Sequence, residues 1–375
     1  MGKSLIALIT NNDDDVYCFR KELIDGLLAE GYEMLISCPY GPKFELMKDI
    51  PFRYDDSIID RRGTNIVSDA KLFLHYRRLF KKHKPNVVLT YTAKPNVYAS
   101  AAARLLGIPY INNVTGLGSV LSKTGLMRTF IMTLFKIAYR GAACVMFQNS
   151  TNMQLALDSR MVNGDYKLIP GSGVNIERYP LQPYPEGGNG IEGETIIFNY
   201  IGRILRDKGV DDYIEAAKRI KKRYPNTEFN MLGFIEPTES HYEKELRELG
   251  QQGIVYYRGS QKNVKPWIAR AHAIIHPSIY GEGMSNVLLE NASSGRPIIT
   301  TDNPGCQETV VKDKTGFIYQ GGNIDILVET IERFLKIDNK KRKLMGLEGR
   351  KYVKDNFSRE VVVTAYKEEI KKIIE

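Results

Sequence analysis

Residues 272–302, HAIIHPSIYGEGMSNVLLENASSGRPIITTD, contain two short apolar runs separated by a helical pattern. The first run, HAIIHPS, and the last, PIITTD, are rich in β-branched residues and therefore predict strands. The helix predicted between them covers about residues 285–295. A strand, a helix and a second strand in this order are the unit from which parallel sheets covered by helices are built.

The same alternation continues along the rest of the chain. Further strands are predicted by the β-branched runs SLIALI, EMLIS, PNVVLTY, IPYINNV, TIIFNYIG, TEFNMLG and IVYYRG. Helical patterns lie between them, at about residues 16–30, 97–106, 210–224, 239–250 and 263–271. Because strands alternate with helices, the chain is predicted to be an α/β protein with parallel sheets and helices on both sheet faces.

The length and one irregular stretch predict two domains. A chain of 375 residues is long for one hydrophobic core and ordinary for two. Between about 170 and 194 the sequence is dense in Gly and Pro and has no periodicity. We therefore predict an amino-terminal domain over 1–176, a carboxy-terminal domain over 177–357, and a last helix over 358–375 that crosses back to the first domain. Both domains are predicted to be Rossmann-like, with parallel sheets facing across a cleft.

The composition is that of a soluble globular protein, with 43% hydrophobic and 26% charged residues. No uncharged run reaches the roughly 20 residues that a membrane-spanning helix needs. The apolar stretch in MGKSLIALIT is too short for a signal peptide, so we expect the protein in the cytosol. The four cysteines are scattered and lack zinc-binding spacing, which favours reduced, buried thiols.

Positive charge is concentrated in the first half of the chain. Residues 1–180 hold 23 Lys/Arg against 16 Asp/Glu, and residues 70–157 hold twelve Lys/Arg and no acid. A field of one sign over that length favours an anionic partner, such as a membrane surface, a diphosphate-bearing substrate or nucleic acid. The chain contains no recognisable nucleic-acid-binding module, so nucleic acid is not expected as a partner.

Open α/β sheets bind ligands at the carboxyl ends of their strands. After the strand TIIFNYI, Gly202 turns the chain, and Arg203 and Lys208 flank the turn before a helix. Two cations beside a helix amino terminus are suited to a diphosphate. Taken alone, the same two residues are equally well explained as solvated surface charges.

Two carboxylates accompany the second strand end. Glu282 lies in the loop after HAIIHPS, and Ser285 or Asn286 can cap the following helix. Helical side chains lean toward the amino terminus, so Glu290 can reach back to the same place and accept two hydrogen bonds from a vicinal diol such as ribose. Taken singly, Glu282 is as well explained as a solvated loop acid, and Glu290 as an acid favoured by the helix dipole.

The two stretches together resemble the nucleotide-sugar domain of family 4 glycosyltransferases, which have the GT-B fold. GRILRDKG is similar to that family's GR-x4-KG pattern, and Glu282 and Glu290 match its E-x7-E motif. The tail SGRPIITTDNPGCQETVVKDKTGFIY also resembles the family. The resemblance is strong over about 195–357 and looser over 1–180. It implies retaining sugar transfer from a nucleoside-diphosphate sugar, with no metal and no cofactor besides the donor substrate.

The resemblance also implies roles for single residues. Arg203 and Lys208 would hold the donor diphosphate and stabilise its charge as it leaves. Glu282, the third residue of the catalytic set, would face the donor sugar together with the backbone amides of Gly283 to Asn286. Glu290 would bind the ribose. The other donor-binding residues implied are Gly202, Gly283, Met284, Ser285, Asn286 and Ser260. Among these, Ser260 lies where the family's backbone receives the base, and Met284-Ser285 stands where many relatives have Phe-Gly, so it bears on donor identity.

The first half is expected to bind the acceptor. TYTAKPNVY and NNVTGLGS resemble a polysaccharide-assembly subgroup that adds N-acetylated or deoxy-amino sugars to polyprenyl-diphosphate-linked saccharides. The acceptor-binding residues expected are Asp13, Lys94, Thr115 and Gly116. The alternatives are a helix-start acid for Asp13, a solvated lysine for Lys94 and an ordinary loop for the Gly116–Gly118 turn. All histidines are interpreted as structural, and no side chain is assigned as general base, because in a front-face mechanism the departing phosphate oxygen takes the acceptor proton.

Two basic amphipathic helices, predicted over 66–82 and 126–140, carry part of the acid-free region. Their apolar faces are expected to pack into the core, and docking on anionic lipid is the alternative. The resemblance implies a retaining hexosyltransferase, and the subgroup resemblance favours a UDP-sugar as its donor; the basic region adds the expectation of a peripheral enzyme on the cytoplasmic face of the plasma membrane. It would extend a lipid-diphosphate-linked saccharide in polysaccharide or capsule synthesis. The rivals are a GT-B enzyme with a soluble acceptor and a non-catalytic nucleotide-sugar-binding subunit.

Overall fold

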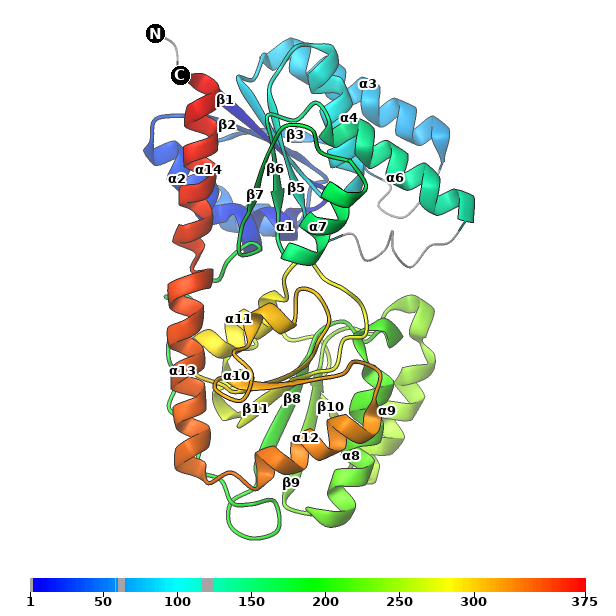
Figure 1. The fold of residues 1–375 in the computed structure, drawn as a ribbon, viewed down its shortest axis with the longest axis vertical. Helices are drawn as coiled ribbons and strands as arrows, with labels where there is room; N and C mark the ends of the chain where they lie inside the picture. Colours follow the sequence, from blue (N-terminus) through cyan, green and yellow to red (C-terminus); the bar gives the residue numbers. More distant parts are fainter. Residues whose placement is uncertain (1–2, 58, 60–64, 117–124) are drawn as a thin grey trace. The chain divides into compact units, whose positions relative to one another are not determined.

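The computed structural model describes residues 3–57, 59, 65–116 and 125–375. The chain forms two units, Met1–Gly173 with Arg359–Glu375, and Val174–Ser358 (Figure 1). The chain passes from unit 1 to unit 2 between residues 173 and 174, three residues before the predicted boundary between 176 and 177. It returns to unit 1 between residues 358 and 359, one residue after the predicted boundary between 357 and 358. Each unit is described by itself below.

Unit 1 contains a seven-stranded sheet in the order β3-β2-β1-β4-β5-β6-β7, with every neighbouring pair parallel. The strands are β1 (Leu5–Ile9), β2 (Glu33–Cys38), β3 (Arg53–Asp56), β4 (Val87–Tyr91), β5 (Tyr110–Val114), β6 (Cys144–Phe147) and β7 (Asp165–Leu168). The edge strands β3 and β7 are largely exposed and lack the apolar runs that predict the central strands.

Alternate side chains of β1 enter two different cores. Ile6 and Leu8 pack with α2 (Lys21–Ala29) and α14 (Arg359–Ile374), whereas Leu5, Ala7 and Ile9 pack with α3 (Ile66–His83) and α4 (Ala93–Leu105). This follows from the two-residue period of a strand. Helices α3, α4 and α6 (Gly125–Tyr139) therefore cover one sheet face, and α2 and α14 cover the other (Figure 1).

The helix predicted over 16–30 is interrupted in the structure. It consists of α1 (Asp13–Asp15), the π-helical turn η1 (Val16–Arg20) and α2. Arg20 leaves this turn as a buried side chain that donates to Ser172 Oγ at 2.7 Å and lies over the Tyr91 ring. The other short elements of unit 1 are η2 (Pro42–Met47) and α7 (Ser150–Asp158).

Unit 2 contains a six-stranded parallel sheet in the order β10-β9-β8-β11-β12-β13. Its strands are β8 (Ile196–Ile201), β9 (Thr227–Leu232), β10 (Tyr256–Tyr257), β11 (Ala273–His276), β12 (Ile298–Thr301) and β13 (Gly316–Tyr319). Its helices are α8 (Val210–Arg223), α9 (His241–Gln251), α10 (Lys265–Arg270), α11 (Asn286–Ser293), α12 (Ile324–Leu335) and α13 (Asn339–Phe357). Helices α8, α9 and α12 share one core with the sheet, and α10, α11 and α13 share the other.

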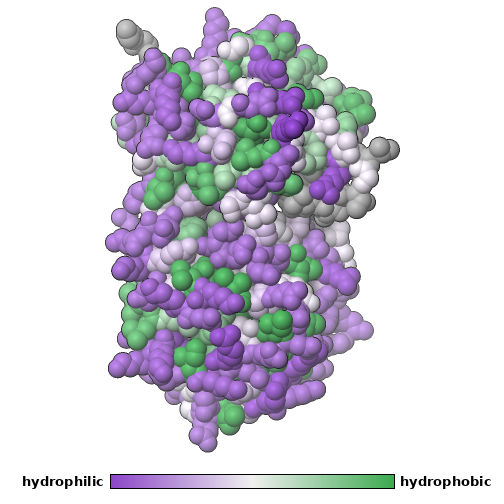
Figure 2. All heavy atoms as spheres, in the orientation of Figure 1, coloured by the Kyte–Doolittle hydropathy of each residue, from purple (hydrophilic) through white to green (hydrophobic). Residues whose placement is uncertain are grey.

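The surface is mixed in character. Figure 2 shows a face on which hydrophilic side chains predominate and apolar ones form small scattered groups. Within the described part of the chain, no helix combines the length and apolarity needed to cross a membrane.

The Pro-rich stretch that follows the unit boundary is fixed to unit 2 by two buried side chains. Arg296 donates to the carbonyl oxygens of Pro183 and Ile268, at 2.6 and 2.8 Å. His272 Nδ1 lies 3.0 Å from the Ile197 N–H, and Nε2 lies 2.9 Å from the carbonyl oxygen of Glu186. Both ring nitrogens are satisfied when the neutral ring carries its proton on Nε2. Burial accordingly lowers the pKa of His272 from 6.5 to about 4.

We predict that His272 makes the protein less stable in acid. Between pH 6.5 and about 4 the unfolded chain binds a proton at this ring that the folded chain does not, so the free energy of unfolding falls as pH decreases. The loss attributable to His272 is at most about 3 kcal/mol. Urea unfolding at a series of pH values should show a shallower decline for His272→Gln than for the wild type. His241→Gln, which leaves His272 in place, should retain the wild-type slope, and equal slopes in all three proteins would contradict the assignment.

Candidate functional site

The donor residues predicted from the sequence follow the carboxyl ends of strands in the unit 2 sheet, in loops or at the start of α11. The loop after β8 carries Arg203 and the short helix η3 (Arg206–Lys208), and the loop after β11 carries Glu282. Strands β8 and β11 are hydrogen-bonded neighbours, so their carboxyl ends are adjacent. The parallel topology therefore brings together side chains that are more than 70 positions apart in the sequence.

The loops after β8 and β9 are joined through their backbones. The Gly202 N–H donates to Leu232 O at 2.9 Å, and the Ile204 N–H donates to Phe234 O at 2.9 Å. Gly233 has φ 149°, and a Cβ atom there would lie 1.7 Å from Gly202 O, so this close approach requires glycine. The backbone on both sides of Arg203 is therefore hydrogen-bonded to the loop after β9.

Arg203 has a carboxylate partner that the sequence reasoning did not identify. Its guanidinium Nη1 donates to Glu236 Oε1 at 2.9 Å. The Glu236 side chain is 4% exposed and that of Arg203 is 45% exposed. The buried acid thus holds one side of the guanidinium while the rest faces solvent. Glu236 follows the end of β9 by four residues, and this position after a strand is the signal that could have indicated it.

Lys208 and Glu282 form the central ion pair of the site. Lys208 Nζ lies 2.7 Å from Glu282 Oε1, and the two side chains are 13% and 17% exposed. Next to Lys208, Gly209 has φ 74°, and a Cβ atom there would lie 2.0 Å from Pro277 O. The close packing at this glycine presses the loop after β8 against the end of β11 and so places the two charges together.

His276 also contacts Glu282, although the sequence reasoning treated this histidine as structural. Its Nε2 lies 3.0 Å from Glu282 Oε1. Burial alone would raise the pKa of Glu282, but Lys208 and His276 outweigh that effect and hold the pKa well below its ordinary value. Glu282 is therefore a partly buried carboxylate that stays ionised.

Cys306 completes a group of metal-ligand type with His276 and Glu282, in which one ligand atom of each lies within 4.8 Å of the others. The Lys208 ammonium already pairs with Glu282 at this place, so the carboxylate is engaged by a cation of the chain itself.

The loop before α11 is hydrogen-bonded to the loop after β12. The Glu282 N–H donates to Pro304 O at 2.9 Å, and the Ser285 N–H donates to Gly305 O at 2.8 Å. This corrects one expectation, because the Ser285 amide is used within the chain. Ser285 occupies the N-cap position of α11, but its hydroxyl does not cap the helix and lies 3.4 Å from His276 Nε2.

The side chain of Met284 differs most from the expectation. It is buried in a core cluster with Ile274, Leu288 and Cys306. Met284 thus anchors its loop to the hydrophobic core of unit 2. Any influence of Met284 on a bound sugar therefore acts through the loop conformation. Glu290 lies in α11 four residues after Asn286 and is partly exposed, on the same helix face. Ser260 is exposed after β10, where Gly259 O accepts from the Gly233 N–H at 3.0 Å.

The expected acceptor residues follow β1, β4 and β5, which are neighbours in the unit 1 sheet. Asp13 begins α1 and accepts the Lys43 N–H at 2.9 Å, so it fixes a neighbouring loop. Lys94 is not a solvated lysine, because its Nζ lies 2.6 Å from Asp69 Oδ1 and both side chains are largely buried. Thr115 and Gly116 are partly exposed after β5. The continuation of this turn, Leu117 and Gly118, lies outside the described residues.

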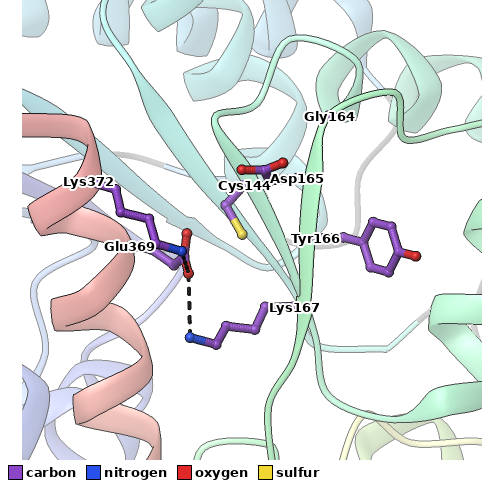
Figure 3. A pocket seen from close by; sticks show the side chains of 7 residues that line it. All are labelled: Cys144, Gly164, Asp165, Tyr166, Lys167, Glu369 and Lys372. Carbon is purple, nitrogen blue, oxygen red and sulfur yellow. Dashed lines mark hydrogen bonds and ion pairs between the residues drawn. The ribbon is translucent and has the colours of Figure 1, made fainter.

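A cavity of about 350 Å³ in unit 1 lies elsewhere, between β7 and α14 (Figure 3). Its lining includes Cys144 and Asp165, which are the first residues of β6 and β7. Ligands of open α/β sheets bind at the other, carboxyl end of the strands. The cavity's lysines are also paired, since Lys167 contacts Glu368 and Glu369, and Lys372 contacts Glu369. We do not assign the functional site to this cavity.

Two family models match the chain. "Glycosyl transferase 4-like" matches residues 6–149, and "Glycosyl transferases group 1" matches residues 186–352. The second match includes all the donor residues predicted from the sequence. The first includes all four expected acceptor residues.

Three curated relatives are similar over most of their length. The "Capsular polysaccharide biosynthesis glycosyltransferase CapM" of Staphylococcus aureus is 26% identical, over 83% of this chain and 84% of the relative. The "N,N'-diacetylbacillosaminyl-diphospho-undecaprenol alpha-1,3-N-acetylgalactosaminyltransferase" of Campylobacter jejuni is 24% identical, over 88% and 89%. The "UDP-Gal:alpha-D-GlcNAc-diphosphoundecaprenol alpha-1,3-galactosyltransferase" of Escherichia coli is 21% identical, over 79% and 78%.

The fold is also found among solved structures. The crystal structure of a glycosyltransferase from Rickettsia africae matches with a TM-score of 0.81 and 18% identity, covering 100% of both chains. This likeness, together with two parallel-sheet α/β units, shows the GT-B fold that the sequence predicts.

We predict that the Lys208–Glu282 pair stabilises unit 2. Lys208→Met should lower the free energy of unfolding by about 2–4 kcal/mol, because it leaves a largely buried carboxylate without its main counter-charge. The double variant Lys208→Met/Glu282→Gln should recover part of the loss. As a matched control, Lys314→Met breaks the exposed pair with Glu348 and should cost less than about 1 kcal/mol. Urea denaturation measures all three, and equal losses for the two single variants would contradict the prediction.

Proposed function

Because this chain belongs to family 4 of the glycosyltransferases and has the GT-B fold, we propose that it is a retaining hexosyltransferase that uses a UDP-sugar. Its acceptor is a polyprenyl-diphosphate-linked saccharide, and its product enters a surface polysaccharide or capsule. The observation that carries the proposal is the arrangement of Arg203, Lys208 and Glu282 at the carboxyl ends of β8 and β11. Two relatives act on diphospho-undecaprenol-linked saccharides and one acts in capsular polysaccharide biosynthesis, which supports the proposed acceptor and product.

The two cations serve the donor diphosphate. Arg203 is held on one side by Glu236 and presents the rest of its planar guanidinium to solvent, where it can bind two phosphate oxygens. Lys208 has three N–H donors, of which Glu282 takes one. Both charges are positioned before the donor binds, so they stabilise the negative charge that develops on the leaving diphosphate without further reorganisation.

The carboxylates serve the two ends of the donor. Glu290 leans toward the amino terminus of α11 and accepts hydrogen bonds from the ribose hydroxyls. Glu282 faces the transferred sugar, together with Gly283 and the amino-terminal amides of α11. The transferred sugar is an N-acetylated or deoxy-amino hexose, in line with the N-acetylgalactosaminyltransferase of Campylobacter to which the chain is similar. UDP as the nucleotide is in line with the UDP-Gal-dependent relative of Escherichia.

The transfer itself uses no protein base and no metal. The oxygen of the departing diphosphate takes the proton of the acceptor hydroxyl as that hydroxyl attacks the anomeric carbon from the same face. Arg203 and Lys208 supply the positive charge at the leaving group. Glu282, the carboxylate of the group that it forms with His276 and Cys306, is engaged by Lys208.

The lipid-linked acceptor places the enzyme on the cytoplasmic membrane surface. Helix α3 buries Leu72, Tyr76, Leu79 and Phe80, as its amphipathic pattern predicts, but exposes Ile66 and Val67. Helix α6 exposes Phe130 and Ile137, and the exposed Arg140 directly follows this helix. The single acid of α3, Asp69, is paired with Lys94. Exposed apolar side chains accompanied by exposed basic residues suit the interface of an anionic bilayer.

We predict that donor use depends on Arg203 and Glu290. EDTA at about 1 mM removes divalent cations from the assay. In its presence the wild type should transfer sugar from one of a panel of UDP-, GDP- and dTDP-sugars to a polyprenyl-diphosphate-linked acceptor. Arg203→Ala should lower kcat/KM about 100- to 1,000-fold, because it removes charge stabilisation from the leaving group. Glu290→Ala should act chiefly on KM, by about 10- to 100-fold, because it removes hydrogen bonds made in the ground state.

The matched control is Arg206→Ala. Arg206 lies three residues after Arg203, is largely exposed and pairs with Asp211 at 3.4 Å; its removal should change kcat/KM less than about threefold. Unaltered transfer by Arg203→Ala and Glu290→Ala would overturn the site. Nucleotide-sugar binding without turnover in the wild type would favour the non-catalytic subunit instead, and transfer abolished by EDTA would overturn metal independence.

We also predict binding to anionic vesicles. The protein should sediment with vesicles that contain phosphatidylglycerol, less with phosphatidylcholine alone, and less as salt is raised. The double variant Arg78→Glu/Lys82→Glu on α3 should reduce sedimentation at least about tenfold, since each basic residue near the surface contributes about 1 kcal/mol. Lys343→Glu/Lys351→Glu, on exposed positions of α13 in unit 2, is the matched control. No sedimentation of the wild type would favour a soluble acceptor.

A further inference from the structure

His276 occupies one of the most constrained positions in unit 2. It is the last residue of β11, which lies between β8 and β12 in the sheet. Its backbone oxygen accepts from Thr300 Oγ1 at 2.9 Å, and its ring stacks near Tyr200 of β8 with a centroid distance of 6.5 Å. The side chain is 3% exposed. The ring is therefore buried and packed beside β8, and the backbone that carries it is hydrogen-bonded to β12.

The polar contacts of this ring are one-sided. Nε2 lies 3.0 Å from Glu282 Oε1 and 3.4 Å from Ser285 Oγ. Nδ1 is buried and has no hydrogen-bond partner among the described residues. A buried N–H without a partner is rarer and costlier than a lone pair without one, which favours a neutral ring with its hydrogen on Nε2. In that tautomer the ring donates to the Glu282 carboxylate.

An imidazole is a costly choice for this position if it only fills space. The preceding residues of β11, Ile274 and Ile275, are fully buried aliphatic side chains. An aliphatic residue at 276 would avoid the unpartnered Nδ1, whose burial costs free energy. The hydrogen bond to an ionised carboxylate, which is stronger than one between neutral groups, is what offsets that cost.

We infer that His276 is a positioning residue of the transfer reaction, and this rests on the function proposed above. Lys208 and His276 both hold Glu282 through the same oxygen, Oε1. When the donor diphosphate binds, Lys208 divides its hydrogen bonds between the phosphate and Glu282. His276 is fixed by the sheet and keeps its N–H on Glu282, so the carboxylate stays directed at the sugar. His276 itself exchanges no proton with the substrate.

Three substitutions at one position separate this role from a purely structural one. His276→Gln can place its amide N–H near the position of Nε2, whereas His276→Asn is too short to reach Glu282 and His276→Leu fills space without a donor. We expect His276→Gln to retain kcat/KM within about threefold. We expect His276→Asn and His276→Leu to lose about 10- to 100-fold in kcat/KM for the UDP-sugar, the effect of removing a hydrogen bond to a charged group.

A second readout concerns the part of the donor that is affected. Glu282 faces the sugar, whereas UDP is held by Arg203, Lys208 and Glu290. The dissociation constant of UDP, measured by isothermal titration calorimetry, should therefore change less than about threefold in all three variants. Circular dichroism at the assay temperature verifies that each variant is folded, and His276→Gln keeps the test valid if the shorter side chain prevents folding.

His272→Gln is the matched control, because His272 is a second buried histidine, directly before β11 and at the opposite end of the strand. It should lower stability without changing kcat/KM by more than about threefold. Equal transfer rates in the Gln, Asn and Leu variants at position 276 would overturn the inference, as would a loss of UDP binding in proportion to the loss of transfer. If the wild type transferred no sugar from any donor, the proposed function would fall, and with it the role of His276.

Discussion

The contact between Lys208 Nζ and Glu282 Oε1, at 2.7 Å, is the interaction on which the site depends. It joins the loops that follow two neighbouring strands, β8 and β11. A cation and an anion therefore lie side by side at the carboxyl ends of these strands. A partly buried carboxylate without this partner would favour protonation. With it, Glu282 remains ionised and Lys208 remains at the place where a phosphate is expected.

The other contacts around the pair restrict how it can move. Gly209 and Gly233 allow backbones to approach more closely than any side chain would permit, and the amides of Glu282 and Ser285 attach their loop to the loop after β12. His276 and Glu236 then hold the two functional charges, Glu282 and Arg203, from the protein side. The arrangement is therefore largely preorganised, which is the property that electrostatic stabilisation of a leaving group requires.

Much of the fold could be predicted from the sequence because the central strands are buried on both faces. A strand such as TIIFNYI or PNVVLTY must be continuously apolar when helices cover both sides of a parallel sheet, and this signal is local. The edge strands β3 and β7 carry no such signal, because three of the four residues in each are exposed. The π-helical turn at Val16–Arg20 was also missed; its last residue, Arg20, contacts Ser172 and Tyr91, which lie far away in the sequence.

By itself the sequence predicted the fold class and the division into two units, and its motifs indicated Arg203, Lys208, Glu282 and Glu290 as the proposed donor site, because strand periodicity and motif spacing are properties of short segments. Only the tertiary structure decided that His276 touches Glu282, that Glu236 holds Arg203, that Met284 points into the core and that Lys94 is paired with Asp69. The physical reason is that the Arg203–Glu236 and Lys94–Asp69 pairs join residues 33 and 25 positions apart, while the burial of Met284 and the contact of His276 with Glu282 depend on how the loop after β11 folds back on the sheet. Which of them meet is set by the order of strands in the sheet and by the packing of helices upon it, and neither is written in a local pattern.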